Sequence, residues 1–394
     1  MSRSRSIIIA GAGIGGLTAA LALVRTGHRV VILEAARQLT EAGAGIQLSP
    51  NATRVLATLD IAEHLIPKSI GVEAIRIMSG RSGREIVRIP LSDAIASRYS
   101  APYWTIHRGD LQRALLDAVE GNPDIVLRLG VSFVDHAVHA NGVTVIAKTQ
   151  SGVLVEEHGL AVVGADGLWS QVRSSLGHRP PRFRKRTAWR TLLPADAVDP
   201  RWREAMTNLW LGSDAHLVHY PVKGGSAINV VATMKDRNEA QGWSNVGAAK
   251  VLLTRFQRWS PDARAILAAA ASWQTWSLYA LSSPRWGRGP ATLLGDASHA
   301  MLPFLAQGGA LAIEDAAVLA SCVARSPGDI AQAFRSYEGL RQARVARASR
   351  SASWTGVIYH LKGPLAAARN RVMQRLGDEK LLERQNWLYD WTNS

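Results

Sequence analysis

The sequence predicts an α/β fold in which a parallel sheet covered by helices is interleaved with a second lobe built on a mainly antiparallel sheet. Three observations lead to this prediction. Residues 7–34 have the pattern of a strand, a glycine turn, a helix and a second strand. Between about 180 and 290, tryptophans are frequent and prolines interrupt short strand-like segments. A buried strand pattern returns at residues 291–296, and an alanine-rich helix follows from about 308 to 324.

The N-terminal segment indicates the parallel sheet. Ile7, Ile8 and Ile9 form a short apolar run of the kind found in strands buried on both faces. The helix after the glycines is expected to end at Gly27, and residues 28–34 form the next strand. This succession opens a βαβ unit, whose two strands are parallel. Further strands are expected at residues 142–146 and 159–163, and the chain from about 330 is expected to be mostly helical.

A glycine motif lies between the first two strands. Gly11, Gly13 and Gly16 have the spacing GxGxxG. Glycines at these positions permit a tight turn, the close approach of a pyrophosphate and close packing of helix on strand, with the helix N-terminus facing the phosphates. Glu34 follows about twenty residues later at a strand end, where a carboxylate accepts hydrogen bonds from ribose hydroxyls. The combination predicts a Rossmann-like dinucleotide site without deciding between NAD and FAD.

Two further glycine–acid motifs follow buried strands much later in the chain. Residues 164–173 place Asp166, Ser170 and Arg173 near a helix start, a pattern that a β-turn and a helix cap explain equally well. Residues 294–303 carry Asp296 at a strand end, before the glycines that open the alanine-rich helix. A carboxylate there suits ribityl or ribose hydroxyls, and the helix start suits the negative charge of a reduced flavin. Because a simple NAD-dependent dehydrogenase leaves both motifs unexplained, they favour FAD.

Composition limits the other classes of function. The chain has 394 residues, of which 47% are hydrophobic and 20% charged, as in a globular protein. Its net charge of +15 suits anionic ligands, but the basic residues are dispersed and no nucleic-acid-reading motif is present, so nucleic acid is not an expected partner. No apolar run approaches the roughly 18 residues that span a bilayer. A single cysteine, Cys322, excludes an internal disulfide and a cysteine-based metal cluster. We expect a cytoplasmic enzyme without a metal or a stable membrane association.

The three motifs together resemble the class A flavoprotein monooxygenases, which share the para-hydroxybenzoate hydroxylase fold. The resemblance covers nearly the whole chain, and residues 43–52 and 106–111 look like the family's flavin-side segments. A narrower similarity is to the salicylate hydroxylase, 3-hydroxybenzoate 6-hydroxylase and 6-hydroxynicotinate 3-monooxygenase subgroup, in residues 303–308, 312–316, 358–364 and 386–391. It implies bound FAD, NADH or NADPH as electron donor, and O2 activated as a flavin C4a-hydroperoxide that hydroxylates a small phenolic or hydroxypyridine carboxylic acid. A homodimer is the expected assembly.

The resemblance also implies a division into interleaved parts. Residues 1–75, 102–178 and 280–350 would form the FAD-binding domain, residues 76–101 and 179–279 the substrate domain, and residues 351–394 a helical C-terminal segment. Arg108 would meet the FAD phosphates, Asp296 the pyrophosphate–ribityl region, and Asp166 a stretch that handles both FAD and NAD(P)H. The expected cofactor-binding residues are Gly11, Gly13, Ile14, Gly15, Gly16, Glu34, Ala35, Gly45, Arg108, Asp166, Asp296, Pro303, Gln307, Gly308, Gly309 and Ala310.

The family often has Gly and Asn where this chain has Ala306 and Ala310. An asparagine side-chain contact with the flavin is therefore not expected here, although backbone contacts are unaffected.

The chemistry requires an electron-rich ring, so a base that removes the phenol proton is expected beside the substrate. Side chains alternate along a strand, which places His216, Val218 and Tyr220 on one face. His216 and Tyr220 are the candidate catalytic residues, and the subgroup has a His and a Tyr at this spacing. A register shifted by one residue makes His219 the candidate instead. A His and a Tyr bonded within the sheet for structural reasons is the other alternative.

Gln47, Arg190 and Pro303 complete the candidate substrate-binding residues. Gln47 is expected at the flavin–substrate interface, and the guanidinium of Arg190 matches a carboxylate in bidentate fashion. A surface arginine without such a role is an equally good reading of Arg190. His299 is interpreted as part of the third motif rather than as a base.

Two other functions remain open at this point. One is a different flavoenzyme of the same fold, such as a quinone or polyketide hydroxylase. The other is a flavin-binding sensor without turnover, which would bind FAD but show no substrate-stimulated oxidation of NAD(P)H.

Overall fold

A parallel five-stranded sheet forms one half of the computed structural model, which describes residues 6–39, 44–239, 245–281 and 285–393. Every neighbouring pair of strands in this sheet is parallel, as the βαβ pattern predicts. In spatial order the strands are β19 (Ala291–Leu293), β12 (Ala161–Gly164), β1 (Ser6–Ala10), β2 (Arg29–Glu34) and β8 (Ile125–Leu129). The central strand is covered on both faces, and Ile7, Ile8 and Ile9 have no exposed surface.

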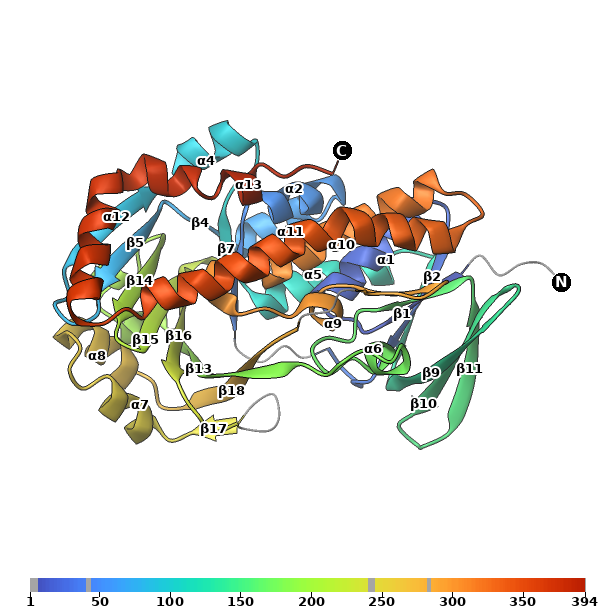
Figure 1. Ribbon diagram of the computed structural model, residues 1–394, viewed down its shortest axis with the longest axis horizontal. Coiled ribbons are helices and arrows are strands. Elements are labelled where there is room, and N and C mark those ends of the chain that lie inside the picture. The colour runs from blue at the N-terminus through green and yellow to red at the C-terminus, as the bar shows by residue number, and fades with distance from the viewer. Residues whose placement is uncertain (1–5, 40–43, 240–244, 282–284, 394) are drawn as a thin grey trace.

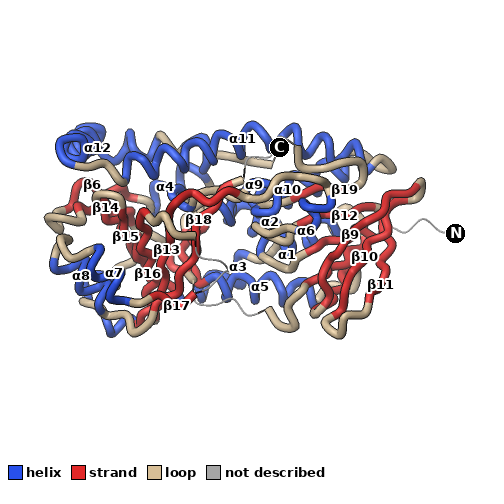
Figure 2. Tube along the Cα trace, turned by 60° about the horizontal axis from the view of Figure 1, so that its bottom comes forward, coloured by secondary structure: helices blue, strands red, loops and turns tan. Residues whose placement is uncertain are grey.

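Helices and a second sheet cover this parallel sheet. The helices are α1 (Ile14–Val24), α5 (Arg108–Glu120) and α10 (Gly308–Arg325). A three-stranded antiparallel sheet packs at the end opposite β13–β18 (residues 182–280) in Figure 2 and consists of β9 (Val131–His139), β10 (Gly142–Thr149) and β11 (Leu154–Gly159). The single strand expected at residues 159–163 is thus divided, because β11 ends at Gly159 and β12 begins at Ala161.

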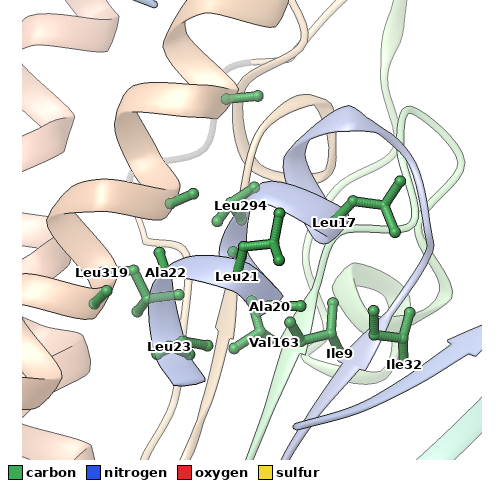
Figure 3. Close-up of a cluster of buried hydrophobic side chains, with 14 of the residues drawn as sticks. Ile9, Leu17, Ala20, Leu21, Ala22, Leu23, Ile32, Val163, Leu294 and Leu319 are labelled. Carbon is green, nitrogen blue, oxygen red and sulfur yellow. The ribbon is translucent and has the colours of Figure 1, made fainter. Parts of the chain in front are cut away.

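The core of this half is an apolar layer between α1 and its neighbours. Figure 3 shows Leu17, Ala20 and Leu21 of α1 against Ile9, Val163 and Leu294. Leu17 and Ala20 have no exposed surface. Burying a leucine side chain contributes about 1.5–3 kcal/mol, so this layer holds the glycine turn firmly against the sheet.

The second half contains a mixed eight-stranded sheet, in which only the β14–β5 pair is parallel. In spatial order its strands are β17 (Asn245–Gly247), β18 (Trp273–Ala280), β13 (Arg182–Pro194), β16 (Ala227–Lys235), β15 (Ala215–Val222), β14 (Met206–Gly212), β5 (Ala74–Ser79) and β6 (Glu85–Pro90). The mainly antiparallel sheet predicted for the tryptophan-rich region is confirmed. Its outer face packs against α7 (Ala249–Arg255) and α8 (Pro261–Ala268), with Trp202, Trp210 and Trp273 in the core.

A small antiparallel sheet lies between the two halves. It contains β3 (Gly45–Leu48), β7 (Trp104–His107) and β4 (Ile70–Gly71), and is accompanied by α2 (Pro50–Thr58), α3 (Ala62–Leu65) and α4 (Ser92–Tyr99). The Thr105 hydroxyl donates to the Pro221 carbonyl of β15 over 2.8 Å. The Gly45 amide donates to Asn229 Oδ1 of β16 over 2.7 Å. These bonds tie the small sheet to the eight-stranded sheet.

The C-terminal region is helical, as expected, and consists of α11 (Ile330–Tyr359), α12 (Gly363–Glu383) and α13 (Asn386–Tyr389). The long helix α11 packs on α10 and continues across the molecule to the eight-stranded sheet (Figure 1). It is continuous through residues 350 and 351, where the sequence resemblance placed a domain boundary. No helix of the described ranges is both long and apolar enough to cross a membrane.

Candidate active site

The three glycine–acid motifs meet at one edge of the parallel sheet. Ala10 at the end of β1 is in register with Gly164 at the end of β12, and Gly164 is in register with Leu293 at the end of β19. Because ligands of open α/β sheets bind outside the carboxyl ends of the strands, this edge is the expected position of a cofactor. Two short helices begin just beyond these ends, α6 (Gln171–Ser175) and α9 (Asp296–His299).

The glycines of the first motif differ in what surrounds them. Gly11 has a φ of +103°, and a Cβ atom there would lie 2.5 Å from the Ala165 carbonyl oxygen. A Cβ atom on Gly16 would lie 2.0 Å from the Gly11 carbonyl oxygen, and one on Gly15 would lie 2.7 Å from Leu294. Gly13 is the exception, because a Cβ atom there would meet nothing within 4 Å. Packing therefore requires three of the glycines, while Gly13 leaves open space at the start of α1, as a pyrophosphate cradle requires.

Glu34 is held beside this turn by backbone amides. Its Oε2 atom accepts from the Ala12 amide and its Oε1 atom from the Ala36 amide, both over 2.8 Å. Ala35, which follows Glu34 directly after the end of β2, is exposed. The carboxylate is thus fixed in orientation and remains partly accessible, which fits the expected role toward ribose hydroxyls.

The second motif forms a capped turn. Asp166 Oδ2 accepts from the Gln171 amide over 2.7 Å and from the Val172 amide over 3.2 Å. Ser170 Oγ accepts from the Arg173 amide over 2.9 Å and is the N-cap of α6. The turn-and-cap interpretation is therefore correct for these side chains. Burial raises the pKa of Asp166, and its Oδ1 atom is buried without a hydrogen bond among the described residues.

Arg173 joins the second motif to the third. Its buried guanidinium donates to the Leu168 carbonyl over 2.7 Å and to the Ala297 carbonyl over 3.2 Å. Two segments more than a hundred residues apart in sequence are thereby placed in contact. In the third motif Asp296 opens α9 with its side chain exposed, while the three residues after it are buried.

The third motif continues into a buried ion network. His299 Nε2 lies 2.6 Å from Asp315 Oδ2, which also accepts from the Gly295 amide over 3.1 Å. Asp315 is paired with Arg341 of α11. His299 thus serves a structural interaction at the base of the motif, in agreement with the sequence interpretation.

The turn before α10 leaves a second open position. Pro303–Leu305 form a 3-10 turn, and a Cβ atom on Gly308 would meet nothing within 4 Å. A Cβ atom on Gly309 would instead lie 2.6 Å from Ile46 of β3. Gln307 donates to Ser49 Oγ over 2.9 Å and its carbonyl accepts from the Leu311 amide over 2.8 Å, so its side chain is committed to the protein interior. Ala310 is buried in α10.

These features fit a flavin dinucleotide. Open backbone at Gly13 and Gly308, an exposed carboxylate at Asp296 and an oriented carboxylate at Glu34 all lie around the carboxyl edge of the parallel sheet. Arg108 begins α5 close to them, and its amide donates to the Ala44 carbonyl over 2.8 Å. An elongated ligand with two phosphates and several hydroxyls matches this distribution of donors and acceptors.

The substrate candidates lie on the inner face of the eight-stranded sheet. The His216 ring contacts Phe304, with the ring centroids 5.2 Å apart, while Tyr220 lies against Gly45 of β3. His219 points to the opposite face and packs against Trp202 and Trp210. The predicted alternation is therefore confirmed, and the shifted register with His219 in the site is wrong.

His216 is a buried neutral imidazole. Burial, the neighbouring His360 and the charge of Arg186 together hold the pKa of His216 well below its ordinary value. Its Nδ1 atom lies 2.9 Å from His360 Nε2, and the ring of Tyr359 packs against it at 5.7 Å. A neutral imidazole in a buried position can accept a proton from a more acidic partner.

Tyr220 and Gln47 form a second polar group on the same face. Tyr103 Oη donates to Gln47 Oε1 over 2.7 Å, and Gln47 also interacts with Tyr220. Burial raises the pKa of Tyr220 to about 12, which keeps its hydroxyl protonated as a donor. A Cβ atom on Gly45 would lie 2.7 Å from the Tyr220 ring, so the glycine permits β3 to approach the sheet closely.

Arg190 also belongs to this face. Arg190 is paired with Val231 of β16, and Val231 is paired with Val218 of β15. Paired residues of neighbouring strands point to the same face of a sheet, and Val218 shares its face with His216 and Tyr220. Its guanidinium stacks 3.9 Å above the Trp276 ring, and its charge acts on Tyr220. Arg190 is half-buried and stacked on this face rather than extended into solvent, and its role toward a substrate carboxylate stays a prediction.

Several residues of this face have no assigned role in the sequence analysis: Tyr103, Arg186, Phe304, Tyr359 and His360. His360 and Tyr359 fall in a segment singled out by similarity, but nothing in their local pattern indicates contact with His216. Arg186, Ala188 and Arg190 are alternate residues of β13, so strand alternation places Arg186 on the same face as Arg190. This alternation is the one signal in the sequence that indicates the position of Arg186.

Comparison with known proteins gives matches over nearly the whole chain. The family described as FAD binding domain matches residues 4–352. The 3-hydroxybenzoate 6-hydroxylase 1 of Aquipseudomonas alcaligenes is 36% identical over 388 residues, which cover 98% of this chain and 97% of that protein. The 3-amino-4-hydroxybenzoate 2-monooxygenase of Streptomyces cremeus is 34% identical over 394 residues, covering 100% of this chain and 96% of that protein. The crystal structure of Klebsiella pneumoniae HpxO complexed with FAD and uric acid has a TM-score of 0.81 and 26% identity, covering 96% of this chain and 95% of that one.

Proposed function

This chain belongs to the FAD-binding domain family, and on that premise we propose that it hydroxylates a small phenolic or hydroxypyridine carboxylic acid. Its relatives are FAD-dependent aromatic monooxygenases, and the chain is an enzyme of this type. The proposal adds the electron donor, NADH or NADPH, and the class of acid, for which salicylate, 3-hydroxybenzoate and 6-hydroxynicotinate are the leading candidates. A cytoplasmic location and a homodimer belong to the same proposal.

The FAD would lie along the carboxyl edge of the parallel sheet. Gly13 and the start of α1 would receive the pyrophosphate, with Arg108 beside the phosphates, and Glu34 would bind the ribose. Asp296 would bind the pyrophosphate–ribityl region, and the open backbone at Gly308 would face the flavin ring. When bound, FAD would supply the activation of O2 and the transfer of one oxygen atom to the ring.

The observation that supports a phenolic acid most directly is the set of side chains on the inner face of the eight-stranded sheet. His216 would accept the proton of the substrate hydroxyl, because it is neutral and buried. Tyr220 would donate a hydrogen bond, and Arg190 would attract the carboxylate. Gln47 and Pro303 would line the space between flavin and substrate. A base, a hydroxyl donor and a cation on one face match the groups of a hydroxylated aromatic acid.

The test is oxidation of NADH and of NADPH by the purified protein, with peroxide measured in parallel. The acids to compare are salicylate, 3-hydroxybenzoate, 6-hydroxynicotinate and 3-amino-4-hydroxybenzoate. We expect one acid to accelerate oxidation with little peroxide and to gain one oxygen atom. If the protein contains FAD and none of these acids accelerates oxidation, the phenolic-acid assignment is refuted. A quinone or polyketide hydroxylase, or a flavin sensor, would then be the better account.

A further inference from the structure

The end of α11 places a second imidazole against the candidate base. His360 is the residue that follows α11, and its Nε2 atom lies 2.9 Å from His216 Nδ1. The two rings are 5% and 4% exposed, so water does not compete for this hydrogen bond. Two neutral imidazoles joined through one nitrogen each must place a proton on one of those nitrogens and a lone pair on the other.

The surroundings of His360 indicate which nitrogen carries the proton. Burial and the charge of Arg186 lower the pKa of His360 to about 3, and the Gly356 carbonyl acts in the opposite direction. A carbonyl oxygen favours a proton on the nitrogen that faces it. Since His360 Nε2 is occupied by His216, the nitrogen left to face the Gly356 carbonyl is Nδ1, which is buried and forms no hydrogen bond of ordinary geometry with the described residues. With its proton on Nδ1, His360 presents a lone pair at Nε2 and accepts from His216 Nδ1–H.

We propose that His360 is a positioning residue that holds His216 in the tautomer whose Nε2 atom is free to accept a proton. This inference rests on the proposed function for its consequence in catalysis, but the tautomer itself is a property of the protein. In the reaction, the substrate O–H bond breaks, an N–H bond forms at His216 Nε2, and the electron pair stays on the phenolate oxygen. His360 Nε2 would share the Nδ1 proton of the resulting imidazolium.

The charged groups around the pair keep it neutral before the substrate arrives. Arg186 of β13 acts on both rings, and Arg369 of α12 acts on His360. Asp214, in the turn before β15, has the opposite effect on His360, but it is ion-paired with Lys362. Tyr359 is uncharged because burial raises its pKa to about 12. Cations therefore predominate around the pair, and protonation before substrate binding is disfavoured.

The packing of α11 explains how a distant segment reaches the site. A Cβ atom on Gly356 would lie 2.4 Å from the Phe304 ring, so this glycine lets the helix approach the turn that holds Phe304. Phe304 in turn contacts both rings, with centroids 5.2 Å from His216 and 5.7 Å from His360. Figure 1 shows α11 running from α10 to the eight-stranded sheet, and its C-terminal end brings His360 to β15.

The tautomer is measured directly by long-range 1H–15N correlation spectra of the 15N-histidine-labelled, FAD-loaded protein without substrate. Signals of His216 are assigned by their loss in His216→Gln. We expect His216 to carry its proton on Nδ1 in the wild type. His360→Leu removes the acceptor and should move the proton to Nε2, whereas the side-chain oxygen of His360→Gln should retain it on Nδ1. Leu365→Ala, at an exposed position of α12 outside the pair, should leave the tautomer unchanged. A proton on His216 Nε2 in the wild type overturns the proposal, as does an unchanged tautomer in His360→Leu.

A second measurement follows the consequence for the bound phenol. Difference absorbance spectra report phenol and phenolate forms of the bound acid as pH is varied. We expect the apparent pKa of the bound phenol to rise by about one unit or more in His360→Leu, which corresponds to about a tenfold loss of phenolate at a given pH. In His360→Gln the apparent pKa of the bound phenol should return to the wild-type value. Equal pKa values in the wild type and His360→Leu contradict the proposal. A wild type that shows the predicted tautomer but binds none of the acids refutes the proposed function alone.

Discussion

Replacement of Arg341 tests how the third glycine–acid motif is held in place. Its side chain is 1% exposed and connects α11 to two acids of α10 that have no exposed surface. The Nη1–Glu314 Oε2 distance is 2.7 Å and the Nε–Asp315 Oδ1 distance is 2.6 Å. Asp315 also binds His299 and the Gly295 amide, so the network supports the turn that carries Asp296.

Replacement of Arg341 by methionine keeps much of the side-chain volume and removes the charge. Asp315 then loses its ion pair with Arg341, and removal of one partner of a buried ion pair costs about 3–5 kcal/mol. The pKa of Asp315 reflects its part of this cost. Burial alone would raise its pKa, but His299 and Arg341 lower the pKa to about 2 from an ordinary value of 3.8. A difference of this size corresponds to about 2 kcal/mol of stability, shared between the two partners.

The pH dependence has a defined sign. A carboxyl group whose pKa is lowered by folding contributes its full stabilisation above the unfolded pKa. The contribution decreases as pH falls from about 4 toward 2. In Arg341→Met this dependence should be weaker, because less of the pKa shift remains.

The assay is denaturant unfolding followed by tryptophan fluorescence, at pH 7 and in the acid range. Arg335→Met is the matched control, because Arg335 is an exposed residue of the same helix whose hydrogen bonds, within the described part of the chain, go to Gln332. We expect the control to remain within about 0.5 kcal/mol of the wild type. Arg341→Met combined with Asp315→Asn should cost less than the sum of the single changes. If Arg341→Met is as stable as the control, the network does not stabilise the fold and the reasoning is wrong.

Two further predictions concern the cofactor and the base. Gly13→Val should fold but lose bound FAD, because the space around Gly13 is open in the protein alone and the backbone there is unstrained. The control Gly339→Val, at an equally open and exposed position of α11, should retain FAD. A Gly13→Val protein with a full complement of FAD would refute the pyrophosphate assignment. His216→Gln should lower hydroxylation by about 10²-fold or more while FAD content is unchanged, as expected for loss of a general base. Equal ratios of product formed to NAD(P)H consumed in His216→Gln and the wild type would eliminate that role for His216.

Short-range patterns predict much of this fold. The apolar run before Gly11, the spacing of Gly11, Gly13 and Gly16, and the acid at Glu34 specify β1, α1 and β2 with their turn. Strand alternation likewise places His216 and Tyr220 on one face, because a period of two depends only on neighbouring residues. Such features are predictable since their physical causes lie within a few residues.

Long-range pairing is the part that sequence reasoning misses. His216 and His360 are 144 residues apart, and their contact depends on the length and direction of α11. Arg341 of α11 forms ion pairs with Glu314 and Asp315 of α10, and nothing local to either segment indicates the pairing. The order of the eight strands depends in the same way on contacts between distant segments.

The most direct test of the central claim is isotopic. The purified enzyme is supplied with 18O2, NADH or NADPH and the acid that accelerates oxidation, and the product is analysed by mass spectrometry. Hydroxylation by a flavin monooxygenase predicts one 18O atom in each product molecule and about one NAD(P)H consumed per product. Product that carries oxygen from water, or oxidation of NAD(P)H that yields only peroxide with every acid, would contradict the account.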